Sequence, residues 1–570
     1  MSKIDIIDDY FKTPIFYNKN KIKLKDNVIS DLELVTTIDP SGVNIYSFAF
    51  NSNNCFSKKL INQISQYYTT DVEYLTDSQN VLKMFNPINN SYDYDKIMCL
   101  WDEIKNDTGF KEKYNYVEWS NLEFLNYSED FLRVMSIYNI TSPILSLITP
   151  LVIFIIPFFI IKIKGINLNF KEYIDILKVI ISNQPMGQLF TKFNSVKIEQ
   201  KICILISSFF YILSIYQNIA SCIKFHKNMK IIHKTLYSIR EYIQHTQLNM
   251  NNFLLYSNKL LSYADFNTDV SFNLKILNEF NEKLNKLTEY NFSFSKVLEL
   301  GNILKSFYEL YNSEKYNNAF LYSFGFNGYI SNLEGLISNI KSGKINFSKF
   351  IDKKIIKSAK IKNNYYAPLI NDSPIKNNIK ISTNIIITGP NASGKTTILK
   401  STLINIILSQ QFGCGFYDSA ILCPYKYIHC YLNIPDTSGR DSLFQAESRR
   451  CKEILDIIQE FKDETHICIF DELFSGTNTC EAVISATAFM KYLVKFKNVS
   501  CLLTTHYIKV CKKLNTNRRI TNYNMHTLKI DDNISNTYLL KKGISEVKSG
   551  LQVLRDLGFP NEMLGMCNPL

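Results

Sequence analysis

A glycine-rich segment between an apolar strand and a helix constrains this chain more than any other feature. Residues 389–396 read GPNASGKT and match the pattern G-x-x-x-x-G-K-[ST]. The apolar run Asn384–Ile387 precedes the segment, and Thr397–Ser409 follows it with helical character. Glycines let backbone N–H groups turn toward an anion, and a helix N-terminus adds the positive end of a dipole. The segment therefore predicts a phosphate-binding loop inside an α/β domain.

The side chains of this loop predict ATP and Mg²⁺ as cofactors. Lys395 has the length to reach the β- and γ-phosphates, and the Thr396 hydroxyl is a ligand suited to Mg²⁺. The predicted nucleotide-binding residues are Gly389, Pro390, Asn391, Ala392, Ser393, Gly394, Lys395, Thr396 and Thr397.

Two further strands end in residues that bear chemistry. The apolar run Ile467–Phe470 delivers Asp471 and Glu472 to the carboxyl edge of a sheet, where ligands of open α/β folds lie. We expect Asp471 to hold the metal and Glu472 to position or deprotonate the attacking water. The run Ser500–Thr504 leads to His506, which can sense a γ-phosphate or serve only as a satisfied structural group. The predicted catalytic set is Glu472, His506 and Lys395.

Five segments in order resemble the ATPase domain of the MutS family. The loop resembles its TGPN-x-x-GK[ST], residues 471–479 its DEL-x-x-GTST, residues 505–507 its THY, and residues 442–447 its S-x-F-x-x-E. The closing pattern is similar over residues 543–545, 549–553 and 557–560. Asn478 departs from the family by replacing the first Ser of TST. The resemblance covers residues 365–570.

The resemblance implies an ATPase that works as a homodimer with composite sites. By this analogy Ser442 reaches in trans to the γ-phosphate bound by a partner, and Asn391 contacts it within its own loop. Read from the residues alone, Ser442 is a helix N-cap with Gln445 three residues on, and both roles are compatible. The family also implies DNA binding.

The family's mismatch-reading domain, with its Phe-x-Glu wedge, is not evident in this sequence. Phe170–Glu172 and Phe280–Glu282 fit the bare pattern, but one lies in a basic connection and the other in a helical stretch, so we interpret both as chance. The chain resembles most a membrane-linked, MutS-related branch that lacks this domain.

An uncharged apolar run predicts a membrane span. Residues 143–161 contain no charge and 14 residues of Ile, Leu, Val or Phe, close to the roughly 20 residues that cross a bilayer. Lys162 and Lys164 follow as interface anchors, and three prolines predict kinks. A weaker run at 202–223 completes a helical hairpin. The alternative is a pair of buried core helices.

The orientation of such a hairpin is poorly specified. The connection 162–201 carries seven Lys and three acids, yet it is translocated if the ATPase is cytosolic, against the positive-inside tendency. A re-entrant or monotopic hairpin removes this conflict. We expect a membrane-associated protein with a cytosolic ATPase domain, and the alternative is a soluble cytoplasmic or nuclear protein.

Charge and cysteine content exclude few classes of protein. The 64 basic and 52 acidic residues give +12, which suits nucleic acid or an anionic membrane, or reflects lysine spread thinly by codon bias. The 13 Cys form no CxxC, the seven His show no metal spacing with them, and the polar, acidic N-terminus is no signal peptide. We expect free thiols in a reducing compartment and no structural zinc.

The sequence predicts an α/β P-loop ATPase domain at the C-terminus, preceded by mainly helical parts. The expected domains are a helical region at 1–140, a membrane hairpin at 141–224, a helical core or lever at 225–355, and a MutS-like ATPase domain at 356–570. Long helices are expected at His226–Met250 and Asn273–Leu300. The alternative function is a soluble DNA-repair or recombination clamp. A non-enzymatic ATP-binding scaffold is disfavoured because the catalytic set is intact.

Overall fold

The computed structural model divides the chain into two compact units, which are described separately. Unit 1 comprises residues 1–94, 248–274 and 321–570, and unit 2 comprises residues 95–247 and 275–320. The structure describes residues 7–88, 92–165, 169–183, 187–189, 193–194, 197–288, 294–351, 359–432, 442–530, 533–547, 554–555, 557–560 and 563.

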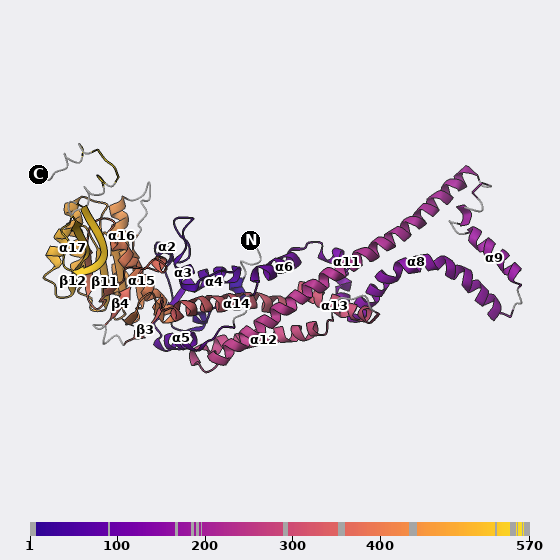
Figure 1. The fold of residues 1–570 in the computed structure, drawn as a ribbon, viewed down its shortest axis with the longest axis horizontal. Helices are drawn as coiled ribbons and strands as arrows, with labels where there is room; N and C mark the ends of the chain where they lie inside the picture. The colour runs from indigo at the N-terminus through magenta and orange to yellow at the C-terminus, as the bar shows by residue number, and fades with distance from the viewer. Residues whose placement is uncertain are drawn as a thin grey trace. The chain divides into compact units, whose positions relative to one another are not determined.

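The centre of unit 1 is a six-stranded sheet in the order β13-β12-β6-β11-β10-β9 (Figure 1). Its strands are β6 (Asn384–Thr388), β9 (Tyr427–Tyr431), β10 (His466–Asp471), β11 (Val499–Thr504), β12 (Ile520–Ile530) and β13 (Asn533–Lys542). All neighbours pair in parallel except β12 and β13, which form an antiparallel hairpin. The predicted strands at 384–388, 466–470 and 500–504 are confirmed, and the parallel pairing brings their carboxyl ends to one edge.

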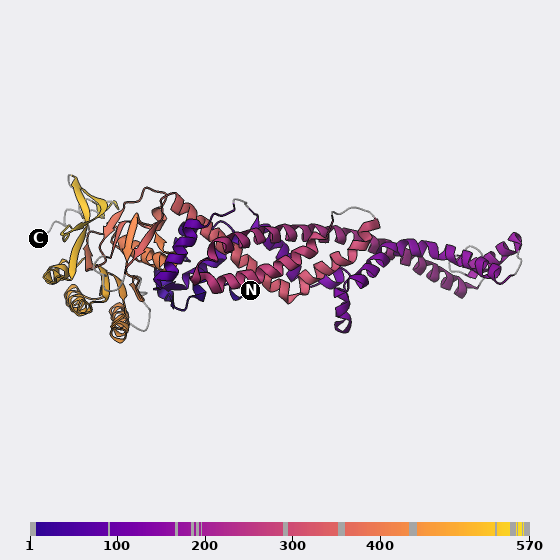
Figure 2. The ribbon, with the colours of Figure 1, turned by 90° about the horizontal axis from the view of Figure 1, so that it is seen from below.

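Helices cover both faces of this sheet because its strands are apolar on both sides. Helices α16 (Leu443–Glu460), α17 (Thr479–Leu493) and α18 (Ile508–Leu514) bury their apolar faces in one cluster with alternate residues of the strands. Figure 2 shows these orange and yellow helices together on one side of the strands. The other face receives α15 (Lys395–Phe412), whose residues from Ile398 to Gln411 are almost all buried. Helix α15 therefore lies inside the domain.

A second, five-stranded sheet packs against α15, in the order β5-β4-β8-β3-β7. Its strands are β3 (Asn346–Phe350), β4 (Lys360–Asn364), β5 (Asn377–Ile379), β7 (Cys414–Gly415) and β8 (Ser419–Leu422). Strand β3 pairs with β7 and β8, so this sheet begins at Asn346 rather than at the predicted boundary of 356.

The N-terminal segment of unit 1 packs on long helices contributed from later in the chain. Its elements are α1 (Ile7–Tyr10), η2 (Pro14–Tyr17), β1 (Lys21–Lys23), α2 (Asp26–Asp31), α3 (Ile45–Phe50), α4 (Cys55–Ser65), β2 (Tyr67–Thr69) and α5 (Val72–Met84). Gly335 of α14 (Glu314–Lys341) lies so close to α3 that a Cβ there would stand 1.6 Å from the Phe50 carbonyl oxygen. The helix can therefore approach α3 only because this residue has no side chain.

Among its described residues, unit 2 has helices as its only regular elements. It contains α6 (Tyr94–Asn106), α7 (Phe110–Lys113), η3 (Ser120–Tyr127), α8 (Glu129–Ile163), α9 (Phe170–Asn183), most of α11 (Ile198–Ser257), part of α12 (Ala264–Asn285), and α13 (Phe294–Asn312). The expected single helix Asn273–Leu300 is wrong, because α12 ends at Asn285, where a turn follows.

The two predicted spans lie in α8 and α11, which run antiparallel. The Tyr211 hydroxyl lies 3.5 Å from the Ser146 carbonyl oxygen, and the Cys222 thiol lies 3.7 Å from that of Ile140. Figure 1 shows α8 curving and α9 lying between the far ends of the two helices. Within the part of the chain that the structure describes, two helical stretches are long and apolar enough to cross a membrane, Glu129–Ile148 and Ile198–Ser257, and only 17% and 11% of their apolar segments are buried. The described part of this hairpin is thus no buried core.

Candidate functional site

The loop between β6 and α15 has the backbone that its glycines predict. Gly394 has φ +91°, which a side chain disfavours, and it is the N-cap of α15. Ala392 adopts φ 56°, also in the left-handed region. The Ser393 hydroxyl donates a hydrogen bond of 2.8 Å to the Pro390 carbonyl oxygen, which closes the loop on itself. The result is a rigid cradle at the start of a buried helix.

Lys395 is folded across this loop. Its ammonium donates to the carbonyl oxygens of Gly389 and Pro390 at 3.2 and 3.0 Å. Burial lowers the pKa of this amine, while Glu472 and Asp471 oppose the shift. A buried cation whose hydrogen bonds go to neutral carbonyl oxygens gains when an anion approaches, so Lys395 is suited to a phosphate ligand.

Asp471 at the end of β10 is held by two hydroxyls. The Thr396 hydroxyl donates to one carboxylate oxygen at 2.7 Å, and the Thr504 hydroxyl donates to the other. The predicted metal ligands Thr396 and Asp471 are therefore adjacent. One hydroxyl and one carboxylate oxygen form a hard donor set, which fits Mg²⁺ held together with phosphate oxygens.

Glu472 and His506 form a pair at the same edge of the sheet. The imidazole Nε2 lies 2.5 Å from the Glu472 carboxylate, and both side chains are about 38% exposed. The hydrogen bond from His506 is the main reason why the pKa of Glu472 is lowered. Glu472 is therefore an acceptor held in a fixed direction at the mouth of the site.

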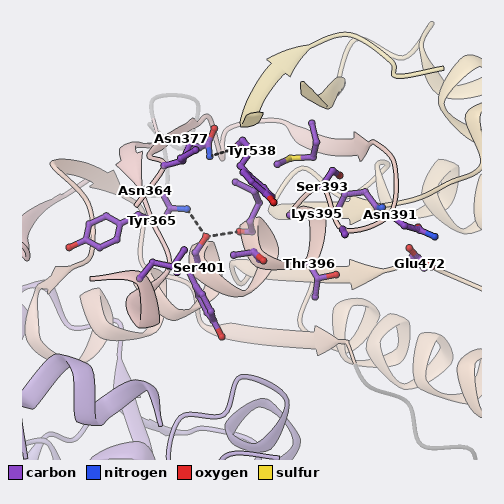
Figure 3. Close-up of a pocket in the computed structure, with 18 residues that line it drawn as sticks. Asn364, Tyr365, Asn377, Asn391, Ser393, Lys395, Thr396, Ser401, Glu472 and Tyr538 are labelled. Atoms are coloured by element: carbon purple, nitrogen blue, oxygen red, sulfur yellow. Dashed lines mark hydrogen bonds between the residues drawn. The ribbon is translucent and has the colours of Figure 1, made fainter. Parts of the chain in front are cut away.

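A cavity of about 620 Å³ extends from the loop toward the second sheet (Figure 3). One end is formed by Asn391–Thr397 and Glu472, and the other by residues that the sequence did not single out. These are Asn364, Tyr365, Tyr366, Leu369, Ile375 and Asn377, whereas Met525 and Tyr538, also not singled out, lie beside Gly389 and Gly394 of the loop. The Asn377 amide donates to the Tyr538 carbonyl oxygen at 3.0 Å, which joins the two walls. The cavity thus has a polar end and an aromatic, aliphatic end.

Ser442 does not line this cavity of its own chain. It is exposed at the N-terminus of α16, where its hydroxyl accepts from Gln445 N at 3.3 Å and Gln445 Oε1 accepts from Ser442 N at 3.0 Å. This reciprocal capping box confirms the structural interpretation of Ser442. Its role in trans remains a prediction.

Fold and site together define a class of domain. A mainly parallel α/β sheet carries a glycine-rich loop between a strand and a helix, and acidic side chains and a histidine stand at the same sheet edge. Residues 385–569 match the family model described as MutS domain V. The C-terminal domain of this chain is therefore similar to domain V of the MutS family.

Individual relatives match about a third of the chain. DNA mismatch repair protein MutS of Bacteroides fragilis is 28% identical over 189 residues, which cover 33% of this chain and 22% of the relative. DNA mismatch repair protein Msh3 of Dictyostelium discoideum is 31% identical over 193 residues, 32% of this chain and 13% of the relative. The matched part therefore spans no more than about a fifth of these relatives.

Proposed function

We propose that this protein binds and hydrolyses ATP with Mg²⁺. The observation that carries the proposal is the convergence of Lys395, Thr396, Asp471, Glu472 and His506 at one edge of the sheet. The loop N–H groups and Lys395 bind and neutralise the phosphates, and Thr396 with Asp471 hold the metal. Mg²⁺ supplies charge neutralisation between phosphate oxygens.

In this proposal Glu472 and His506 together position the attacking water and remove its proton. Because His506 fixes the direction of the Glu472 carboxylate, Glu472 orients a water and accepts its proton. The lowered pKa keeps Glu472 ionised at neutral pH, as a proton acceptor must be. The end of the cavity near the second sheet is suited to the base, because Tyr366, Leu369 and Ile375 line it with aromatic and aliphatic groups.

We infer that two copies complete each other's sites. Ser442 is exposed and outside its own cavity, and the capping box fixes its direction. The family resemblance implies that such a serine reaches the γ-phosphate bound by a second copy.

We also infer that α8 and α11 associate with a membrane. The support is the exposure of apolar side chains on both helices, such as Leu145 at 51%, Phe159 at 57% and Phe209 at 63%. Apolar patches of this extent are rare on monomeric soluble proteins. Four lysines, Lys224, Lys227, Lys230 and Lys234, follow the apolar part of α11 and are exposed, as at a membrane interface. A full chain that stays soluble and monodisperse without detergent would overturn this inference.

A route from the ATP site to the helices of unit 1 runs through the far end of α15. The Gln411 amide donates to the carbonyl oxygens of Ile64 and Tyr67, both at 2.9 Å, and Gln410 donates to those of Thr69 and Tyr425. We propose that this buried network passes changes at Lys395 to α4 and β2.

The client is DNA or a protein, and one experiment separates the two. Two relatives are named as DNA mismatch repair proteins, whereas Phe280 of the second Phe-x-Glu match is fully buried and cannot insert between bases. We would measure ATP turnover of the full chain in detergent, with and without duplex or branched DNA, against Glu472→Gln as the blank. Turnover equal to the blank overturns the ATPase proposal. Turnover that DNA does not change favours a protein client.

A further inference from the structure

The segment that carries Glu472 is conformationally unfavourable. Between β10 and α17, Glu472 has φ 53° and Phe474 has φ 60°, so two residues with side chains lie in the left-handed region within three positions. Such a backbone persists only when its surroundings fix it, and it is common at functional sites. The question is which group holds this segment.

A buried carboxylate on α16 holds it. Glu447 is 2% exposed and accepts three hydrogen bonds from the segment. Ser475 donates its N–H at 3.1 Å and its hydroxyl at 2.9 Å to one oxygen, and the Gly476 N–H donates at 3.2 Å to the other. A buried carboxylate is costly without such partners, so these bonds are strongly favoured.

The backbone of the segment also lies directly against the first turn of α16. A Cβ on Gly476 would stand 2.7 Å from Leu443 Cγ and 2.9 Å from Phe444 N, so only glycine permits this contact. The rings of Phe444 and Phe474 lie with their centroids 5.7 Å apart. The first two turns of α16 and the Glu472 segment therefore form one packed body.

We propose that Glu447 is a positioning residue that ties Ser442 to Glu472, so that contact of Ser442 with a second copy alters hydrolysis at this copy's own site. The proposal rests on the proposed ATPase function and names its regulation. Ser442 caps the helix on which Glu447 lies, and Glu447 holds the segment on which Glu472 and its bond to His506 depend. Movement of the α16 N-terminus therefore reaches Glu472 through three hydrogen bonds.

A Glu447→Gln variant of the full chain in detergent tests the positioning role. The amide keeps the volume but turns an NH₂ group toward N–H donors, so the segment loses part of its hold. We expect kcat to fall by about 10²-fold, as for a displaced catalytic group, while KM for ATP stays within about threefold, because the loop is untouched. Glu453→Gln, an exposed carboxylate on the same helix, is the matched control and should leave kcat unchanged.

Other outcomes would overturn the role. Unchanged kcat in Glu447→Gln, or a change confined to KM, shows that Glu447 only stabilises the fold. If this variant does not fold, Ser475→Ala removes one hydroxyl donor and should lower kcat in the same direction with a smaller effect. Wild-type turnover no higher than that of Glu472→Gln overturns the ATPase proposal and this one with it, whereas an active wild type beside an unaffected Glu447→Gln overturns this one alone.

A double-mutant cycle tests the tie to Ser442. Ser442→Ala should lower kcat by about 10²-fold in the wild-type background, as the loss of a group that contacts the transition state does. In the Glu447→Gln background the same change should cost at least about threefold less, because the tie to Glu472 is already broken and only the direct contact with the partner's site is lost. Effects that multiply independently in the double variant would overturn the connection.

Discussion

The six-stranded sheet of unit 1 and the α8–α11 hairpin of unit 2 both contain many isoleucines, but they expose these side chains to very different extents. Ile385, Ile386 and Ile387 of β6 are completely buried, whereas Ile155 of α8 and Ile206 of α11 are about half exposed. In the sheet, apolar side chains are removed from water by α15 and by α16–α18. In the hairpin no described element covers them. Apolar composition therefore indicates burial, but the partner that provides it can be protein in one unit and lipid in the other.

The largest expected effect concerns the chemistry that only unit 1 contains. Glu472→Gln removes the proton acceptor while keeping the shape of the side chain, and we expect kcat for ATP to fall by about 10²- to 10⁴-fold. Nucleotide binding, measured by equilibrium titration, should change little, since Lys395 and the loop remain. A variant that turns over ATP at the wild-type rate would remove Glu472 from the mechanism.

A lysine placed at an exposed isoleucine in each unit tests whether the hairpin contacts lipid. Ile206→Lys on α11 should disfavour membrane insertion by about 2.5–3.5 kcal/mol and lower the fraction of chain that resists alkaline extraction from membranes. Ile484→Lys on α17, at a site 63% exposed, is the matched control and should change stability by less than about 0.5 kcal/mol. Equal behaviour of the two variants would mean that α11 faces water.

Breaking the buried network at the end of α15 should have a smaller effect, measured as a loss of stability. Gln411→Ala leaves the Ile64 and Tyr67 carbonyls and the Tyr46 hydroxyl without their partner, and should cost about 1–3 kcal/mol in urea unfolding. Gln459→Ala on the exposed face of α16 removes one surface hydrogen bond and is the control. If both variants unfold at the same urea concentration, the network does not join α15 to the N-terminal helices.

The smallest expected effect is a pH dependence from two buried histidines. His429 Nε2 lies 3.2 Å from His466 Nδ1, and His466 Nε2 lies 3.0 Å from the Phe461 carbonyl oxygen, so both rings are neutral in one hydrogen-bonded chain. Burial lowers the pKa of both, with Lys25 and Arg450 adding to the shift of His429. The unfolded chain takes up these protons near pH 6.5, whereas the folded chain does so only at lower pH.

Stability should therefore fall as the pH falls below about 6.5, by at most about 1.4 kcal/mol per pH unit for each histidine. Urea unfolding between pH 7.5 and 5.5 measures this slope. His429→Leu should make the slope shallower, and an unchanged slope would assign the pH dependence to other groups.

The strands that carry the site were readable from sequence because each is a short apolar run that ends in a reactive residue. β6 and β11 are fully buried, β10 is buried except for Asp471, and all three pair in parallel, so their apolar pattern is continuous. Strands β4 and β5 read KIKNN and NNI, which are mostly polar, and β4 pairs on its other side with β8, about 60 residues further along the chain. Propensity gives no signal for such strands, so the second sheet and the Tyr365 and Asn377 side of the cavity were missed.

The role of Glu447 was missed for a related reason. The sequence places a glutamate five residues after a helix cap, as many helices have. Its function depends on where Ser475 and Gly476 lie in space, 28 and 29 residues further along the chain. The break after Asn285 was likewise invisible to helical periodicity, because Leu287 continues the apolar pattern.

The length of helix α11 fixes the directions in which its buried side chains point around the helix axis. The helix runs for 60 residues from Ile198 to Ser257 without a glycine or proline, and within unit 2 it buries residues such as Phe225 and Tyr242. Each residue turns the helix by about 100°, so deleting one residue between these positions rotates one buried face away from the other by that angle. Removing seven residues restores the alignment to within about 20°. The length of this helix is therefore free to vary only in steps close to whole numbers of turns, such as about seven or about eleven residues.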